Sequence, residues 1–165
     1  LRRELLAAQA RHESSSAAAP VAAPAAAPAV MPKVTGDMTC PVAGPVSFVD
    51  SWGAPRSGGR SHEGVDMMAS TGTPVAAIVS GTITLSSYGE SAGNWQILSG
   101  DDGNSYWYMH NDQNIVNGGH VNVGTQIATV GGTGNASESA PHLHFEYHPG
   151  GGGPVNPYPL VASLC

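Results

Sequence analysis

Histidine occurs in three short segments of the sequence beside other side chains that bind metals or move protons. The segments are 60–66 (RSHEGVD), 106–110 (YWYMH) and 141–146 (PHLHFE). Neutral imidazole and carboxylate groups both bind transition metals, and imidazole also exchanges protons near neutral pH. The sequence therefore offers metal-assisted or acid–base chemistry, and the spacing within each segment indicates which residues can act together.

The third segment places two imidazoles on one side of a predicted strand. Because side chains alternate along a strand, His142 and His144 project to one face, and Leu143 and Phe145 project into the opposite layer. Two imidazoles on a buried strand are costly to leave without partners, so the pair indicates a metal or a shared catalytic centre. A solvated surface pair is the alternative.

The first segment adds a carboxylate. In an extended strand His62 and Asp66 would lie about 13 Å apart, too far to share an ion, but Gly64 between them permits a bend. Histidines and one carboxylate, with one position left for water, are typical of a catalytic zinc site. A structural zinc site would have four protein ligands, usually thiolates, and Cys40 and Cys165 lie far from these segments in sequence.

The second segment supplies an additional histidine and two tyrosines. Tyr106, Tyr108 and His110 alternate, which predicts that they face one side of a strand. A histidine beside the site can exchange a proton, and a hydroxyl such as that of Tyr108 can stabilise an oxyanion or contact substrate. A structural role for His110, after a run of aromatic residues, is the alternative.

The segments that would position these residues have a β pattern throughout. Runs rich in Val, Ile, Thr, Tyr and Trp, bounded by Gly, Asn, Asp or Ser, occur at 74–79, 81–85, 94–98, 105–110, 126–130 and 142–148. Residues 101–104 (DDGN) form a good hairpin turn between two of these runs. After Cys40 no glycine-free segment of ten residues keeps a helical period. The sequence predicts an all-β domain, a small antiparallel sandwich or barrel-like fold with glycine-rich loops.

Composition divides the chain into three parts. All ten aromatic residues and 21 of the 22 glycines follow Cys40, which predicts the folded domain at 40–165. Residues 1–13 are rich in helix formers and predict the end of an upstream helix or coiled coil, with a coiled-coil partner. Residues 14–39 carry prolines four residues apart within a run of alanines, which predicts a semi-rigid linker.

Charge and cysteine content limit the class of protein. The net charge is −6 and only Arg56 and Arg60 are basic after Cys40, which argues against a nucleic-acid partner. No apolar run approaches the roughly 20 residues of a transmembrane segment. Cys40 and Cys165 bound the aromatic-bearing region, and this favours a disulfide over two free thiols. A disulfide predicts an extracytoplasmic location: secreted, periplasmic or associated with the cell wall.

Taken together, the segments resemble the M23 family of zinc metallopeptidases, also called lysostaphin-like or LytM-type. His62–Asp66 resembles its H-x-x-x-D motif, His142–His144 its H-x-H motif and Tyr108–His110 its Tyr-x-His strand. The joining segments 72–83 (GTPVAAIVSGTI) and 121–134 (VNVGTQIATVGGTG) are also similar to the family. The likeness extends from about residue 40 to residue 158.

This resemblance implies roles that spacing alone does not assign. His62, Asp66 and His144 would bind one zinc ion per domain, and His110 and His142 would flank the attacking water and the developing negative charge. The implied activity is hydrolysis of the peptide cross-links of bacterial peptidoglycan by an endopeptidase of LytM-type fold.

Two other classes remain open, and several polar residues receive no role. A catalytically silent LytM-like regulator or wall-binding module would not need all five residues. A sugar phosphotransferase phosphocarrier has a similar fold but is cytosolic and needs no carboxylate ligand. Outside the site, we expect His120 and His148 to be solvated and Glu63 and Glu138 to lie on loops or the surface; His12 belongs to the tail.

Overall fold

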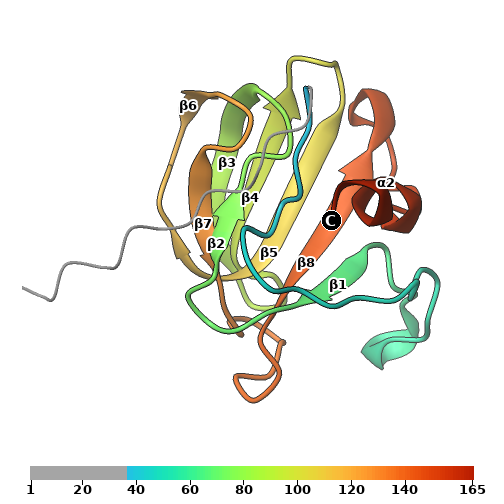
Figure 1. Cartoon of the computed structure of the whole chain (residues 1–165). Helices are drawn as coiled ribbons and strands as arrows, with labels where there is room; N and C mark the ends of the chain where they lie inside the picture. The colour runs from blue at the N-terminus through green and yellow to red at the C-terminus, as the bar shows by residue number, and fades with distance from the viewer. Residues whose placement is uncertain (1–36) are drawn as a thin grey trace, which may run out of the picture.

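A computed structural model describes residues 37–165 of the chain (Figure 1). The helix predicted at 1–13 and nearly all of the linker predicted at 14–39 lie outside the described residues. No helix in residues 37–165 is long and apolar enough to cross a membrane.

Eight strands make up most of the described chain. They are β1 (Val65–Met68), β2 (Pro74–Ala76), β3 (Gly81–Gly89), β4 (Gly93–Gly100), β5 (Ser105–Asn114), β6 (Gly119–Val121), β7 (Gln126–Val130) and β8 (His142–His148). Six of them coincide with the runs predicted from the sequence, although β2 ends three residues before the end of its predicted run; β1 and β6 are additional. The predicted turn at 101–104 does connect β4 to β5.

Every strand pairing is antiparallel, as predicted. The strands follow the order β1-β8-β5-β4-β3-β6, and β7 pairs with both β2 and β5. Figure 1 shows the long strands β3, β4, β5 and β8 side by side, and β6 lies at the free edge of β3. Asn111 of β5 pairs with β4 on one side and with β7 on the other. The side of β5 that does not pair with β4 therefore pairs first with β8, over residues 105–109, and then with β7, over residues 111–114.

Three short helical segments, none of them predicted from the sequence, complete the fold. The single turns η1 (Ser57–Gly59) and η2 (Pro149–Gly151) lie in glycine-rich loops, and α2 (Tyr158–Leu164) ends the chain. The expectation of an almost entirely β domain missed α2, because seven residues are too few to show a helical period in sequence. The helix buries Val161 against the core.

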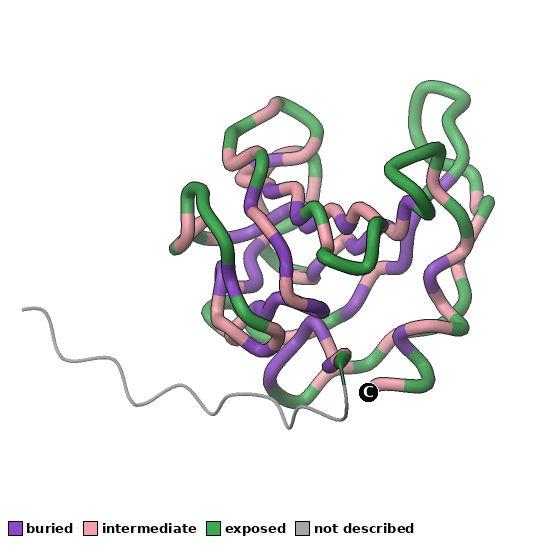
Figure 2. The backbone as a smooth tube through the Cα atoms, turned by 90° about the horizontal axis from the view of Figure 1, so that it is seen from above, coloured by how far each residue is buried: buried purple, intermediate pink, exposed green. Residues whose placement is uncertain are grey.

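The core lies on one face of the sheet, and alternation along the strands decides which side chains reach it. On β8, Leu143 and Phe145 are fully buried, as predicted, and on β1 the same is true of Val65 and Met67. The buried segments run along the strands, and the exposed segments are mainly loops (Figure 2). The residues that alternate with the core residues on β1 and β8 therefore face the other side, where the candidate site lies.

A disulfide joins the two ends of the domain. Cys40 and Cys165, 125 residues apart in sequence, are bonded as predicted. Cys40 packs against the core, and Cys165 directly follows α2. The bond therefore fixes the start of the domain to its C-terminal helix.

Candidate metal centre

The pairing of β1 with β8 places a carboxylate directly beside an imidazole. Asp66 and His144 are cross-strand neighbours in this ladder, and both project away from the core. His62 precedes β1, and two backbone hydrogen bonds fix its loop: its N–H donates to the carbonyl of Ala54, and its carbonyl accepts from Gly53. These constraints bring together three side chains that are 4 and 78 residues apart along the chain.

Gly64 permits this approach because it has no side chain. A Cβ atom there would lie 2.7 Å from His144 Nε2 and 2.6 Å from the carbonyl oxygen of Phe145, both closer than van der Waals contact. Its φ is not in the left-handed region. The chain does bend at Gly64, as predicted, and the missing side chain has a second effect, because it lets the backbone pack closely against His144.

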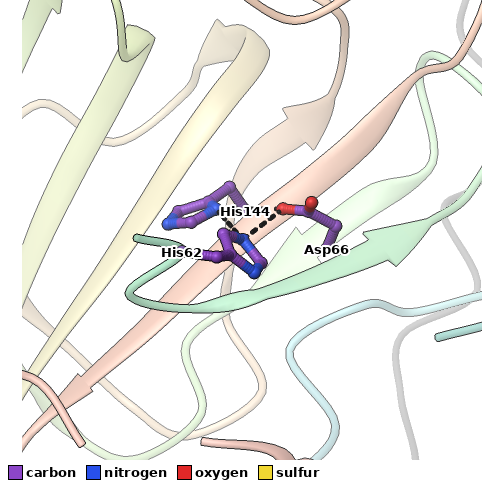
Figure 3. A group of neighbouring side chains, drawn as sticks. All are labelled: His62, Asp66 and His144. Atoms are coloured by element: carbon purple, nitrogen blue, oxygen red, sulfur yellow. Dashed lines mark hydrogen bonds and ion pairs between the residues drawn. The ribbon is translucent and has the colours of Figure 1, made fainter. Parts of the chain in front are cut away.

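Three potential ligand atoms form a nearly equilateral triangle (Figure 3). His62 Nε2 lies 3.0 Å from both Asp66 Oδ1 and His144 Nδ1, and the last two atoms are 2.9 Å apart. In a tetrahedral zinc site, bonds of about 2.0–2.1 Å set neighbouring ligand atoms about 3.3 Å apart. A small outward movement would give that separation, so two imidazoles and one carboxylate fit the ion in number, type and spacing.

Each ligand imidazole has its other nitrogen facing an acceptor. His62 Nδ1 lies 3.0 Å from the carbonyl oxygen of Ser51, and His144 Nε2 lies 3.0 Å from Glu146 Oε1. A hydrogen on each of these nitrogens leaves the lone pair on the nitrogen that points to the centre of the triangle. Sequence reasoning missed both partners. Ser51 comes from another loop and leaves no local signal, whereas Glu146 lies two residues after His144 on β8, so alternation along the strand could have indicated it.

The carboxylate of Asp66 is held in its charged form. Burial alone would raise the pKa of Asp66, but in the metal-free site, where the facing ring nitrogens can carry hydrogens, hydrogen bonds from His144 and His62 outweigh burial and hold that pKa well below its usual range. Arg56 donates to Oδ2 of the same carboxylate, the oxygen that does not face the triangle. Asp66 therefore offers a single, ionised oxygen to a metal.

Two more histidines lie beside the triangle. The ring of His110 is 5.0 Å from that of His142 and 5.9 Å from that of His144, measured between centroids. The Nδ1 of His110 lies 2.9 Å from the carbonyl oxygen of Thr133, and the Nδ1 of His142 lies 2.9 Å from that of Ala140. When Nδ1 donates to these oxygens, Nε2 of each ring can accept a proton.

His110 is neutral near pH 7. Burial, together with the nearby charge of His142, lowers the pKa of His110 to about 4, despite the hydrogen bond to Thr133 that favours its charged form. His142 Nε2 lies 3.7 Å from Asp66 Oδ1, so this ring also reaches the centre. The arrangement therefore combines three metal-binding groups with two imidazoles able to act as bases.

The prediction that Tyr108 faces the site is wrong. Tyr108 is fully buried in the core, and its hydroxyl oxygen accepts a hydrogen bond from the backbone N–H of Ile78. Tyr106 is also buried, and its hydroxyl donates to Asp102. Neither tyrosine can stabilise an oxyanion at the site. The expected alternation fails because the β4–β5 ladder is irregular just before His110, whose φ is 64°.

The remaining polar residues divide between surface and interior. His120, Glu63 and Glu138 are exposed, as expected, and His120 pairs with Asp101. The expectation that His148 is solvated is wrong: its ring is buried between Glu146, Gly152 and Trp107. Its sequence neighbours, a strand end and a glycine run, gave no sign of this contact.

Residues 60–157 match the sequence model of peptidase family M23. The chain belongs to this family. It is 35% identical over 89 residues to the peptidoglycan DD-endopeptidase ShyC of Vibrio cholerae, a match that covers 53% of this chain and 20% of ShyC. The matched part of lysostaphin from Staphylococcus simulans is likewise 18% of that protein. The chain thus spans about a fifth of the length of these curated relatives.

Solved structures of M23 peptidases share the fold. The catalytic domain of lysostaphin superposes with a TM-score of 0.61 at 32% identity, over 71% of this chain and 92% of that domain. A zinc-containing peptidase from Vibrio cholerae gives a TM-score of 0.55 at 26% identity, over 76% of this chain and 37% of that one. The prediction of an antiparallel β fold of LytM type is therefore confirmed.

Proposed function

We propose that residues 40–165 form a zinc-dependent endopeptidase that hydrolyses peptide bonds in the cross-links of bacterial peptidoglycan. The triangle of His62 Nε2, Asp66 Oδ1 and His144 Nδ1 carries the proposal. It is the only cluster of metal-binding groups in residues 37–165, and it offers three protein ligands. Three ligands of this kind are typical of catalytic zinc, whereas structural zinc has four.

The side chains around the triangle can perform the acid–base work of hydrolysis. A bound zinc ion supplies a Lewis acid and lowers the pKa of water at its open position to about 7. His110 is uncharged at that pH, so its Nε2 can take a proton from a nucleophilic water. When the ring of His142 carries hydrogens on both nitrogens, its Nε2, near Asp66, can donate to the peptide oxygen on which negative charge builds. Such proton transfers and hydrogen bonds typically contribute about 10²–10⁴-fold to a rate.

The nature of the relatives supports a substrate in the cell wall. Their names include a peptidoglycan DD-endopeptidase, lysostaphin and an L-Ala–D-Glu endopeptidase of Bacillus subtilis. The last is 30% identical over 137 residues, which cover 74% of this chain. The disulfide between Cys40 and Cys165 supports an extracytoplasmic location, where this substrate lies.

A digestion experiment tests the proposal. The purified chain, after removal of metal by a chelator, is to be incubated with a panel of purified walls, with and without added zinc, and released fragments identified by mass spectrometry. We expect zinc-dependent release of peptide fragments that identify the bond cut. Full zinc occupancy without release from any wall would favour the silent regulator or wall-binding module.

The ligand assignment is tested separately. His62→Ala, Asp66→Ala and His144→Ala should each lower the zinc content of the purified protein, measured by elemental analysis. His120→Ala is the control, because this exposed imidazole also pairs with a carboxylate but lies outside the triangle. Full zinc content in one of the three variants would remove that residue from the ligand set.

A further inference from the structure

Glu146 is a buried carboxylate with two histidine partners. It lies on β8 two residues after His144, on the same face of the strand, and its side chain is only 8% exposed. Its Oε1 is 3.0 Å from His144 Nε2, and its Oε2 is 2.7 Å from His148 Nε2. Both carboxylate oxygens of Glu146 are thus placed to accept hydrogen bonds, one from His144 and one from His148.

His148 anchors the far side of this carboxylate. Its Nδ1 lies 2.8 Å from the carbonyl oxygen of Gly152, and its ring stacks on Trp107 with 4.4 Å between centroids and 17° between planes. The N–H of Gly152 in turn donates to the carbonyl of Pro149, which closes the turn around η2. A line of hydrogen bonds therefore extends from the glycine-rich loop through His148 and Glu146 to His144.

This line of hydrogen bonds ends at His144 Nε2, and whether that nitrogen carries the ring hydrogen determines which nitrogen of His144 can bind a metal. His144 Nδ1 lies in the triangle, and it can be a ligand only if its lone pair is free and the hydrogen is on Nε2. A carboxylate accepts hydrogen bonds and cannot donate them, so Glu146 favours this form of His144. A fixed partner on the second nitrogen also prevents rotation of the ring.

We propose that Glu146 is a positioning residue, which fixes His144 with its hydrogen on Nε2 and its Nδ1 toward the metal, and that His148 holds Glu146 in place. The inference rests on the proposed metal site. His62 has a different arrangement, because its Nδ1 faces both the hydroxyl and the backbone carbonyl of Ser51, and side-chain substitution does not remove the carbonyl. Glu146 is therefore the side chain on which the orientation of His144 depends.

Three substitutions separate positioning from charge and from packing. Glu146→Gln keeps an oxygen that accepts from His144, and its amide can donate to His148 Nε2 while His148 Nδ1 still donates to Gly152. Glu146→Met has a similar length but accepts no such hydrogen bond. His148→Phe keeps an aromatic ring against Trp107 but removes the partner of Glu146 Oε2. His120→Phe is the control, since the His120–Asp101 pair is exposed and distant from the triangle.

The measurement is the zinc dissociation constant of each full-chain variant, from competition with a chromophoric chelator. Loss of a residue that orients a metal ligand typically weakens binding about 10–100-fold. We expect this loss for Glu146→Met, a loss of about threefold or less for Glu146→Gln, a loss of a few-fold for His148→Phe, and no change for His120→Phe. Equal losses for Glu146→Met and Glu146→Gln would overturn positioning in favour of charge.

Nuclear magnetic resonance of the zinc-loaded protein gives a second readout that a packing role would not change. The Nε2–H of His144 should be a slowly exchanging imidazole proton in the wild type and in Glu146→Gln. It should exchange faster in His148→Phe, which keeps the test decisive if Glu146→Met does not fold. Unchanged exchange and unchanged zinc affinity in His148→Phe and Glu146→Met would overturn the inference.

These outcomes are distinct from failure of the proposed function. A wild type that binds zinc but cuts no wall peptide would contradict the function and leave the role of Glu146 standing. A wild type that binds no zinc would overturn both.

Discussion

Tyr108 and His110 are two residues apart on β5, yet their side chains project to opposite faces of the sheet. Tyr108 lies in the core, and His110 lies beside His142 and His144. In the β4–β5 ladder, Asn94 pairs with Asn111 and Gln96 pairs with Tyr108. A step of two residues on β4 therefore faces a step of three on β5, so β5 has one extra residue there. The extra residue and the left-handed φ of His110 together turn its side chain to the site.

The backbone at position 110 should prefer glycine to alanine. A φ of 64° is strained for residues with a Cβ, and glycine adopts it without that cost. We expect His110→Gly to have a free energy of unfolding about 1 kcal/mol higher than His110→Ala. In a regular strand the order would be the reverse. Urea denaturation of both variants measures the difference, and a more stable alanine variant would mean that position 110 is not left-handed in solution.

The sequence predicted features that depend on local pattern and missed those that depend on tertiary contact. Alternation correctly placed Leu143 and Phe145 in the core because β8 is regular along its length. The same rule failed at Tyr108, since an extra residue in one strand of a ladder leaves no mark in composition. His148 was misplaced for a related reason: its partners come from its own strand, a following loop and β5.

Gly64 should not tolerate a side chain. A Cβ there would lie within 2.8 Å of two atoms of the His144 ring and 2.6 Å from a backbone oxygen. Gly64→Ala should therefore displace His144, weaken zinc binding and lower the free energy of unfolding by about 1–3 kcal/mol. Gly153→Ala is the matched control, because nothing lies within 4 Å of its Cβ and its φ is not left-handed. Equal zinc affinity for the two variants would show that β8 can move away.

Loss of the disulfide should destabilise the domain strongly. The bond closes a loop of 125 residues, worth about 4–5 kcal/mol in the chain-entropy model. The double variant Cys40→Ser, Cys165→Ser should lose stability of this order in denaturant unfolding. Hydrogen exchange should increase most in α2, which Cys165 follows. Titration of the denatured, unreduced wild type should find no free thiol, and two free thiols would contradict the bond.

The contribution of His110 to the stability of the metal-free protein should fall as the pH is lowered from about 6.5 to about 4. Its folded pKa is about 4, below the 6.5 of an unperturbed histidine, so the unfolded state binds the proton more readily. The stabilisation is present above pH 6.5 and is lost as the pH falls to about 4, by about 3 kcal/mol. In excess chelator, His110→Gln should show a smaller decrease over this range than the wild type. Equal decreases would contradict the lowered pKa.

His110 and His142 should be needed for turnover but not for metal binding. Neither belongs to the triangle of ligand atoms, but His142 Nε2 lies 3.7 Å from Asp66 Oδ1 and the ring of His110 lies 5.9 Å from that of His144. His110→Ala and His142→Ala should each retain about one zinc per chain, measured by elemental analysis. Each should lose about 10²–10⁴-fold in turnover of a cross-linked muropeptide, because a proton acceptor or a donor to the peptide oxygen is gone.

The same two variants distinguish a catalytic centre from a structural one. If either histidine were a fourth ligand, the protein alone would saturate the ion and leave no position for water or substrate. Its removal would then release zinc together with activity, whereas a catalytic role predicts that zinc is kept. His120→Ala, a substitution at an exposed imidazole, should leave both quantities unchanged. Wild-type turnover in His110→Ala or His142→Ala would show that this residue has no part in the reaction.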